Sequence, residues 1–234
     1  MRSETLGFNW EFDADDWDST QVGKEVACFR LKKLMSEFVW DITHLEDNPY
    51  DFIEVQTLLE GITIGGHTLA EQQQVLNQHR SLQQIFDLVK KDKFCFTDES
   101  IKNAHSIIAE EEALEWGCLR KGEVSISGTD HKPPSAHQLE LLFTTGIKTL
   151  QLISHPVERA LAYFCFGSIN QFFYDGNKRT SRWTMNGILM SHGYNYLSIP
   201  GAKKDEFNQL MIDFYNSKDA TKVMRFMRAC YLVD

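Results

Sequence analysis

The stretch from Gln171 to Arg182, which reads Q-F-F-Y-D-G-N-K-R-T-S-R, decides the fold of this chain. An apolar helical pattern precedes it and a second helical pattern follows it. Gly176 permits the positive φ angle that a tight loop can require. Asn177 can close this loop or act as the N-cap of the next helix, which Lys178 would then open. The stretch therefore predicts two helices joined by a short loop.

The start of the second helix is suited to an anion. Its exposed N–H groups and its dipole attract negative charge. Arg179 and Arg182 are three residues apart, so they project from the same helical face. Asp175 lies just before the loop, where a carboxylate can hold a divalent cation that bridges phosphates. Together these features predict a nucleoside triphosphate site. The alternative is an ordinary capped and solvated helix end, and the glycine spacing differs from that of a P-loop.

The composition predicts a folded protein without a general affinity for polyanions. The 234 residues are 42% hydrophobic, which is enough for one domain with a good core, and the net charge is -9. Binding to nucleic acid or to an anionic membrane relies on basic patches, so we expect neither partner. No apolar run is long enough to span a bilayer, and the acidic, aromatic stretch from Met1 to Asp18 lacks the apolar core of a signal peptide.

The cysteines and histidines show no metal-binding or disulfide pattern. The five cysteines are scattered, odd in number and without C-x-x-C spacing. They indicate reduced, mostly buried thiols, and we therefore expect a cytoplasmic protein. His155 and His192 are interpreted as helix-end residues rather than as metal ligands.

Apolar periodicity predicts an all-α domain with one short β-hairpin. Val124 to Ser127 alternate as a strand would, and Lys121-Gly122 offers a turn. We expect helices over about 20–45, from Asn48-Pro49 to Glu60-Gly61, over about 68–91, over 97–113, and repeatedly after Pro134.

At the opening stretch the chain resembles the Fic (Fic/Doc) family, whose motif reads H-P-F-x-[D/E]-G-N-[G/K]-R-x-x-R. Two positions depart from the motif: Gln171 stands where the family has its catalytic histidine, and Phe172 where it has proline. The matching positions are Phe173, Asp175, Gly176, Asn177, Lys178, Arg179 and Arg182.

The resemblance extends over about 52–231 and implies a Fic-type helical bundle. His155-Pro156 to Ala160 matches a family helix that precedes the motif. The segment of about 118–134 resembles the family's hairpin, the flap, which binds an extended target segment by strand addition. Its target-binding residues would be Val124, Ser125, Ile126 and Ser127. We accordingly divide the chain into an N-terminal extension and helix, 1–47, and a Fic-like domain, 48–234, with the motif loop at 171–182.

An inhibitory helix is the third expectation from the resemblance. Class II Fic proteins carry [S/T]-x-x-x-E-[G/N] before the core, and Gln56 to Gly61 fits except that Gln56 replaces Ser or Thr. The helix of about 49–61 would then be inhibitory, and Glu60 would pair with Arg182. A bidentate carboxylate–guanidinium pair competes with phosphate for the same donors.

The resemblance implies transfer of AMP from ATP to a Ser, Thr or Tyr hydroxyl of a protein. Asp175 would hold magnesium, and the loop residues Gly176, Asn177 and Lys178 would steady the phosphates. The two motif arginines would hold the β- and γ-phosphates. Gln171 cannot accept the hydroxyl proton as a histidine does, because an amide has no titratable base near neutral pH.

Three functional hypotheses follow. The chain is a weak Fic-type AMP transferase, a non-catalytic nucleotide-binding regulatory module, or an interaction protein that binds peptides at the flap. The intact acid, asparagine and arginines favour the first two, and loss of the base favours the second over the first. Expected partners are ATP with magnesium and a protein target, and a homo-oligomer is possible.

Overall fold

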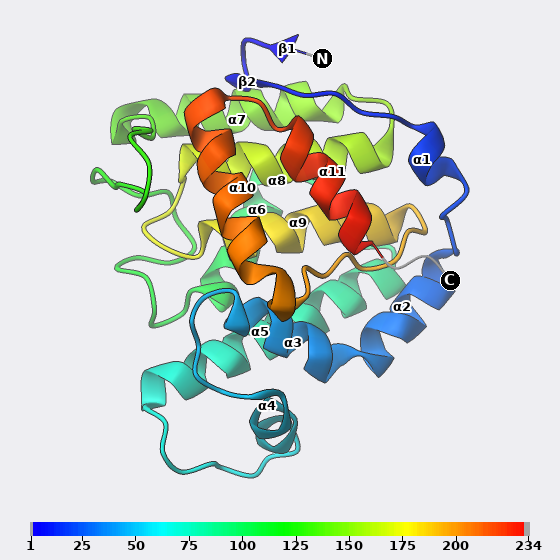
Figure 1. Ribbon diagram of the computed structural model, residues 1–234, viewed down its shortest axis with the longest axis vertical. Helices are drawn as coiled ribbons and strands as arrows, with labels where there is room; N and C mark the ends of the chain where they lie inside the picture. Colours follow the sequence, from blue (N-terminus) through cyan, green and yellow to red (C-terminus); the bar gives the residue numbers. More distant parts are fainter. Residues whose placement is uncertain (1, 232–234) are drawn as a thin grey trace.

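The computed structural model describes residues 2–231, in which helices form almost all of the regular structure (Figure 1). This confirms the all-α prediction. The strands are β1 (Arg2–Ser3) and β2 (Phe8–Asn9). The helices are α1 (Asp15–Asp18), α2 (Lys24–Lys33), α3 (Met35–His44), α4 (Phe52–Leu59), α5 (Leu69–Lys90), α6 (Asp98–Ile108), α7 (Leu139–Gln151), α8 (Pro156–Asn170), α9 (Asn177–Ser191), α10 (Lys204–Ser217) and α11 (Thr221–Cys230), with 3-10 turns η1 (Ala136–Gln138) and η2 (Gly201–Lys203).

Helices α8 and α9 pack closely against each other at the centre of the molecule. Helix α8 is buried along nearly its whole length, in a core cluster that also contains residues of α7, α10 and α11. A second cluster joins α2, α3, α5 and α6. Helix α9 contributes Met185 to the first cluster and Trp183 to the second. The motif loop, which connects α8 to α9, is therefore fixed to both cores at once.

The N-terminal segment packs onto the helices through its aromatic residues. Phe8, Trp10 and Trp17 are buried in the first core cluster. The indole Nε1 of Trp10 donates a hydrogen bond of 2.9 Å to the buried carboxylate of Glu158. Backbone hydrogen bonds tie Asn9 to the corner between α10 and α11. The proposed division of the chain at residue 47 stays a prediction, but α2 and α3 share their core with α5 and α9.

Four helices, α4, α5, α6 and α8, begin at residues whose side chains cap them. Thr68 caps α5, and its side chain and that of Glu71 exchange hydrogen bonds with the backbone as a capping box. Asp51 and Glu54 form the same arrangement at α4. The continuous helix expected over 20–45 is wrong, because the backbone at Leu34 leaves the helical region and separates α2 from α3.

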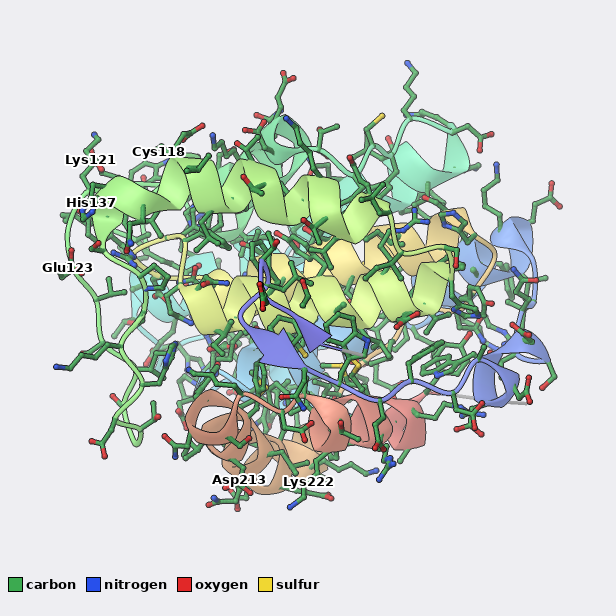
Figure 2. The ribbon with its side chains drawn as sticks, turned by 90° about the horizontal axis from the view of Figure 1, so that it is seen from above. Cys118, Lys121, Glu123, His137, Asp213 and Lys222 are labelled. Carbon is green, nitrogen blue, oxygen red and sulfur yellow. The ribbon has the colours of Figure 1, made fainter. Side chains whose placement is uncertain are left out.

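The expected β-hairpin is also not formed. The segment 118–134, which we call the flap loop, is irregular, and within residues 2–231 the only sheet pairs β1 with β2. The side chain of buried Arg120 takes the place of a strand ladder. Its guanidinium donates to the carbonyl oxygens of Gly122 and Pro134, so it joins the two ends of the loop. Figure 2 shows Lys121, Glu123 and His137 at this end of the molecule, beside the start of α7.

Three further observations concern membrane helices, cysteines and two histidines at helix ends. No helix in residues 2–231 has the length and apolar character needed to cross a bilayer. The five cysteines are free thiols. His155 is the N-cap of α8 and His192 is the C-cap of α9, as the sequence predicted for both.

Candidate functional site

The motif loop leaves α8 and enters α9 through two residues with positive φ. Gln171 ends α8 at a φ of 48°, and Gly176 precedes α9 at a φ of 71°. A Cβ atom on Gly176 would also lie 3.2 Å from that of Ala109, so glycine fits this position for two reasons. Helix α9 begins at Asn177, one residue earlier than the N-cap alternative required, and no side chain caps it. The N-terminus of α9 therefore has no capping side chain, and its first residues line a cleft that is described below.

Asn177 closes the loop with its amide, which was the other alternative. Its Oδ1 accepts from the backbone N–H of Phe173 at 2.9 Å, and its Nδ2 donates to the carbonyl of the same residue at 2.8 Å. The same Nδ2 donates to Oε1 of Gln171 at 3.0 Å. The other end of the Gln171 amide donates to the carbonyl of Ser168 at 2.6 Å. Gln171 therefore braces the loop with both ends of its side chain.

A buried histidine from α6, His105, supports the loop from behind. Its ring stacks on Phe173 with centroids 3.8 Å apart. Its Nε2 is 3.0 Å from the carbonyl oxygen of Asp175, and its Nδ1 accepts from the N–H of Gly117. These partners require a neutral ring with the proton on Nε2. Burial lowers the pKa of His105 to about 4, which keeps the ring neutral at pH 7.

The flap loop and the motif loop are joined by Arg120. Its backbone N–H donates to the carbonyl of Phe172 at 3.0 Å, and its Nε donates to the carbonyl of Gln171 at 2.6 Å. Tyr174 reaches in the other direction, and its hydroxyl accepts from the N–H of Lys121 at 3.3 Å. The two loops therefore behave as one unit around the cleft.

Arg182 pairs with Glu46, which follows α3. Its Nη2 is 2.9 Å from Glu46 Oε1, and Lys178 Nζ is 3.6 Å from Oε2 of the same carboxylate. Burial by itself raises the pKa of Glu46, but Lys178 and Arg182, with Arg179 nearby, together lower it to about 2. Glu46 is therefore ionised at any physiological pH.

The predicted pair of Glu60 with Arg182 is wrong in this structure. Glu60 is the exposed C-cap residue of α4, and the carboxylate in contact with Arg182 is that of Glu46. Figure 1 shows α4 at the bottom of the molecule, away from α8 and α9 at its centre. The glutamate is thus presented by the turn after α3, and not by the predicted helix of about 49–61.

Arg179, which is also buried, lies between two acids. Its Nη1 is 2.5 Å from Oε2 of Glu112, in the turn after α6, and its Nη2 is 3.4 Å from Oδ2 of Asp175. The three cations of the motif therefore face three carboxylates, those of Glu46, Glu112 and Asp175.

A cleft of about 460 Å³ brings most of the predicted site residues together. Residues of the flap loop and of α10 form its other walls. The lining residues are Glu46, Ser125, Ile126, Ser127, Gln171, Asp175, Gly176, Asn177, Lys178, Arg179, Asn208, Met211, Ile212 and Tyr215. Val124 is half-buried in the flap loop and is not part of this lining. Arg182 lies behind Glu46, and its Nε and Nη1 are buried without a hydrogen-bond partner.

The single carboxylate of Asp175 fits a metal ion whose other ligands are phosphate oxygens and water. Its carboxylate is 60% exposed, and within residues 2–231 no group of three or more His, Cys, Asp or Glu side chains could hold a metal ion. Magnesium is commonly held by one or two carboxylates together with phosphate oxygens and water. Asp175 can supply that single carboxylate.

Sequence reasoning missed Glu46, Glu112, His105 and Arg120. The sequence around Glu46 does not match the inhibitory motif, because Ile42 stands where the motif has Ser or Thr and Asp47 stands where it has Gly or Asn. In the structure Asp47 adopts a φ of 62°, the conformation that glycine adopts most readily. The other three have no local signal, because their partners are distant in the sequence.

Comparison with known proteins finds similarity to Fic proteins. Residues 95–189, which contain α6, the flap loop, α8 and most of α9, match the model of the Fic/DOC family. A relative named "Protein adenylyltransferase Fic" from Aedes aegypti is 25% identical over 206 residues, which is 85% of this chain. The chain is therefore similar to Fic proteins over most of its length. It spans 40% of the length of that relative.

Solved structures of Fic proteins share the fold of this chain. Fic-1 from C. elegans superimposes with a TM-score of 0.76 at 20% identity and covers 92% of this chain and 65% of its own. A more distant neighbour, a complex of IbpAFic2 with adenylylated Cdc42, has a TM-score of 0.51 at 13% identity and covers 86% of this chain and 73% of its own. The Fic helical bundle is therefore shared by proteins whose sequences have diverged widely.

Proposed function

We propose that this protein binds ATP with magnesium in the cleft and is, by descent, a protein adenylyltransferase held in a weakly active state. The names of its relatives support the reaction class. In that reaction a protein hydroxyl attacks the α-phosphorus, a new P–O bond forms, the bond to the β-phosphate breaks and pyrophosphate leaves. The proton of the hydroxyl must pass to a base.

The observation that carries this proposal is the state of Arg182. Its Nε and Nη1 are buried with no hydrogen-bond partner, while Nη2 is held by Glu46. Unpaired donors of a buried guanidinium are costly, and they indicate a site for an exchangeable partner. A phosphate that replaced the Glu46 carboxylate would supply charge-assisted hydrogen bonds to this guanidinium.

Residues of this chain have distinct roles in the proposed complex. The open start of α9 and Arg179 orient the phosphates, and Lys178 adds charge. Magnesium, when bound together with the nucleotide, supplies positive charge at the phosphates, and Asp175 is the carboxylate that would hold it. The flap loop presents Ser125, Ile126 and Ser127 to the cleft, where they would contact the target segment.

The missing base limits the rate. The amide of Gln171 has no proton-accepting function at neutral pH, and its oxygen already accepts from Asn177. General base catalysis typically contributes ~10²- to 10⁴-fold, whereas positioning and electrostatic stabilisation carry much of phosphoryl transfer. We therefore expect nucleotide binding to persist while transfer is slow.

Glu46 is the restraint in this proposal, in the role that the sequence suggested for Glu60. Its carboxylate contacts Lys178 and Arg182 and lines the cleft, so a triphosphate must displace it. Release of Glu46 would then free both cations for the distal phosphates.

A non-catalytic nucleotide-binding module is the second candidate. The bracing of the loop by Gln171 favours it, because the side chain at the catalytic position here has a structural task. Both candidates require nucleotide binding, and they differ in whether AMP is transferred.

Titration calorimetry with ATP, with and without magnesium, tests the shared part of the proposal. We expect ATP to bind more tightly with magnesium and Arg179→Ala to weaken this binding by about tenfold or more, since it removes a charge-assisted contact. ATP affinity that is unaffected by Arg179→Ala would contradict the site. A transfer assay with ATP labelled at the α-phosphate then separates the two candidates, because a non-catalytic module leaves no label on protein.

A further inference from the structure

Two sides of the Arg179 guanidinium face different surroundings. Nη1 is 2.5 Å from Glu112, whose carboxylate is largely buried, and Nη2 is 3.4 Å from the mostly exposed carboxylate of Asp175. Arg179 and Asp175 line the cleft, but Glu112 does not. One edge of the guanidinium is therefore held by the protein interior, and the other is directed toward the cleft.

The Glu112 carboxylate is itself fixed by helix α5. Its Oε2 accepts from Nε2 of Gln74 at 2.8 Å as well as from Arg179, and its Oε1 accepts from Nδ2 of Asn77 at 3.0 Å. Both oxygens therefore accept hydrogen bonds from donors on other elements. Only a carboxylate satisfies this arrangement, because a glutamine at 112 would place an NH₂ group against another donor.

We propose that Glu112 is a positioning residue for nucleotide binding, which acts by holding Arg179 so that its free edge faces the phosphates. The proposal rests on the function proposed above and names a residue for that same site. Glu112 is the lasting counter-ion of a buried guanidinium. Asp175, which is loosely paired and exposed, is the partner that yields to a phosphate.

This role differs from that of Glu46. The Glu46 carboxylate lines the cleft and contacts Lys178 and Arg182 from the side on which an anion would bind. Glu112 approaches Arg179 from behind, and an anion in the cleft would not need to displace it. Loss of Glu46 should therefore strengthen triphosphate binding, whereas loss of Glu112 should weaken it. The signs of the two effects are opposite.

The test compares Glu112→Gln with Glu111→Gln, a matched control at the exposed neighbouring residue. We expect Glu112→Gln to weaken magnesium–ATP binding by about tenfold and to leave adenosine binding unchanged. Glu111→Gln should change neither. If Glu112→Gln fails to fold, Glu112→Asp keeps the charge, moves the carboxylate away from Arg179 and should weaken ATP binding in the same direction.

A double-mutant cycle decides whether Glu112 acts through Arg179. On an Arg179→Ala background, Glu112→Gln should have no further effect on ATP affinity. Tighter ATP binding by Glu112→Gln would overturn the proposal, because Glu112 would then be a competitor of the anion. An unchanged affinity, or an equal loss on the Arg179→Ala background, would overturn it as well.

A measurement without nucleotide keeps the proposal independent of the proposed function. In ¹⁵N spectra of arginine side chains, a guanidinium held in one orientation gives separate Nη signals, and Arg179→Lys identifies those of Arg179. We expect separate signals in the unmodified protein and in Glu111→Gln, and averaged signals in Glu112→Gln. Separate signals in Glu112→Gln would show that Glu112 does not orient Arg179, even if ATP does not bind at all.

Discussion

The carboxylate of Glu46 determines, in our proposal, whether the arginine behind it can bind a phosphate. We predict that Glu46→Gly strengthens ATP binding by about tenfold or more and changes AMP binding little, because only the distal phosphates compete for Lys178 and Arg182. The matched control is Glu60→Gly, which removes an exposed glutamate at the end of α4 and should change neither affinity. Calorimetric titration of both variants with ATP and AMP measures this. An equal gain in affinity for ATP and AMP would contradict the proposal that Glu46 competes with the distal phosphates.

Restoring a base at position 171 should raise the rate of transfer. We predict that Gln171→His in the Glu46→Gly background increases labelling of protein by ATP by ~10²-fold or more. The new side chain would lose the hydrogen bond from Asn177 to Gln171, so the loop must remain ordered for the gain to appear. Phe172→Pro, added to the same variant, tests whether the family's proline is needed to orient the imidazole. Rapid labelling by the unmodified chain would show that another group accepts the proton.

Stability should depend on pH through His105. Its pKa in the folded protein is about 4, below the ordinary value of 6.5, so the folded state requires the neutral ring. Its contribution is therefore fully present above pH 6.5 and is lost as the pH falls toward 4, by up to about 3 kcal/mol. Urea unfolding between pH 6.5 and pH 4 should show a larger loss of unfolding free energy in the unmodified protein than in His105→Gln. His137→Gln, at an exposed histidine, should keep the pH dependence of the unmodified protein.

At the scale of elements, the sequence predicted those features that depend on a few neighbouring residues. The apolar periodicity and the glycine loop before α9 are encoded within a few residues and were predicted, whereas the start of α4 was placed at Asn48-Pro49, before its cap Asp51. The flap loop was mispredicted because alternation alone does not pair strands, and the side chain of Arg120, within the loop, bonds the carbonyls of Gly122 and Pro134 instead. The partner of Arg182 was mispredicted for a similar reason, since an Asp at 47 adopts the backbone conformation expected of glycine.

Arg120 should control the order of the flap loop. We predict that Arg120→Met increases hydrogen–deuterium exchange across 118–134 and weakens ATP binding, because three carbonyl acceptors of the two loops lose a buried donor. Lys121→Met is the control, since it removes only an exposed pair with Glu115. Exchange that is equal in the two variants would mean that the loop is held by other contacts.

At the scale of the whole molecule, the N-terminal segment and the helical core form one structure. Trp10 is almost fully buried and donates to Glu158 on α8. We predict that Trp10→Phe destabilises the protein by about 2–3 kcal/mol, because a buried carboxylate loses its donor and the smaller ring leaves space. Trp116→Phe, at a partly exposed tryptophan, should cost much less. Thermal unfolding measures the midpoint of each variant. Similar midpoints for Trp10→Phe and Trp116→Phe would contradict the prediction that Trp10 contributes more to stability.

The segment that carries Glu46 is held by residues far along the chain. Lys204 of α10 contacts the carbonyl of His44 and the carboxylate of Asp47, and Asp41 accepts hydrogen bonds from Ser198 and Gly201. The backbone on both sides of Glu46 is therefore anchored, so the carboxylate leaves the cleft by rotation of its own side chain, which breaks its contacts with Lys178 and Arg182.

This arrangement has a kinetic consequence. If Glu46 must leave before a triphosphate enters, the observed rate of association should rise with ATP concentration and then level off at the rate of opening. Stopped-flow mixing would show this plateau in the unmodified protein. In Glu46→Gly the rate should continue to increase in proportion to ATP, since the slow step is no longer present.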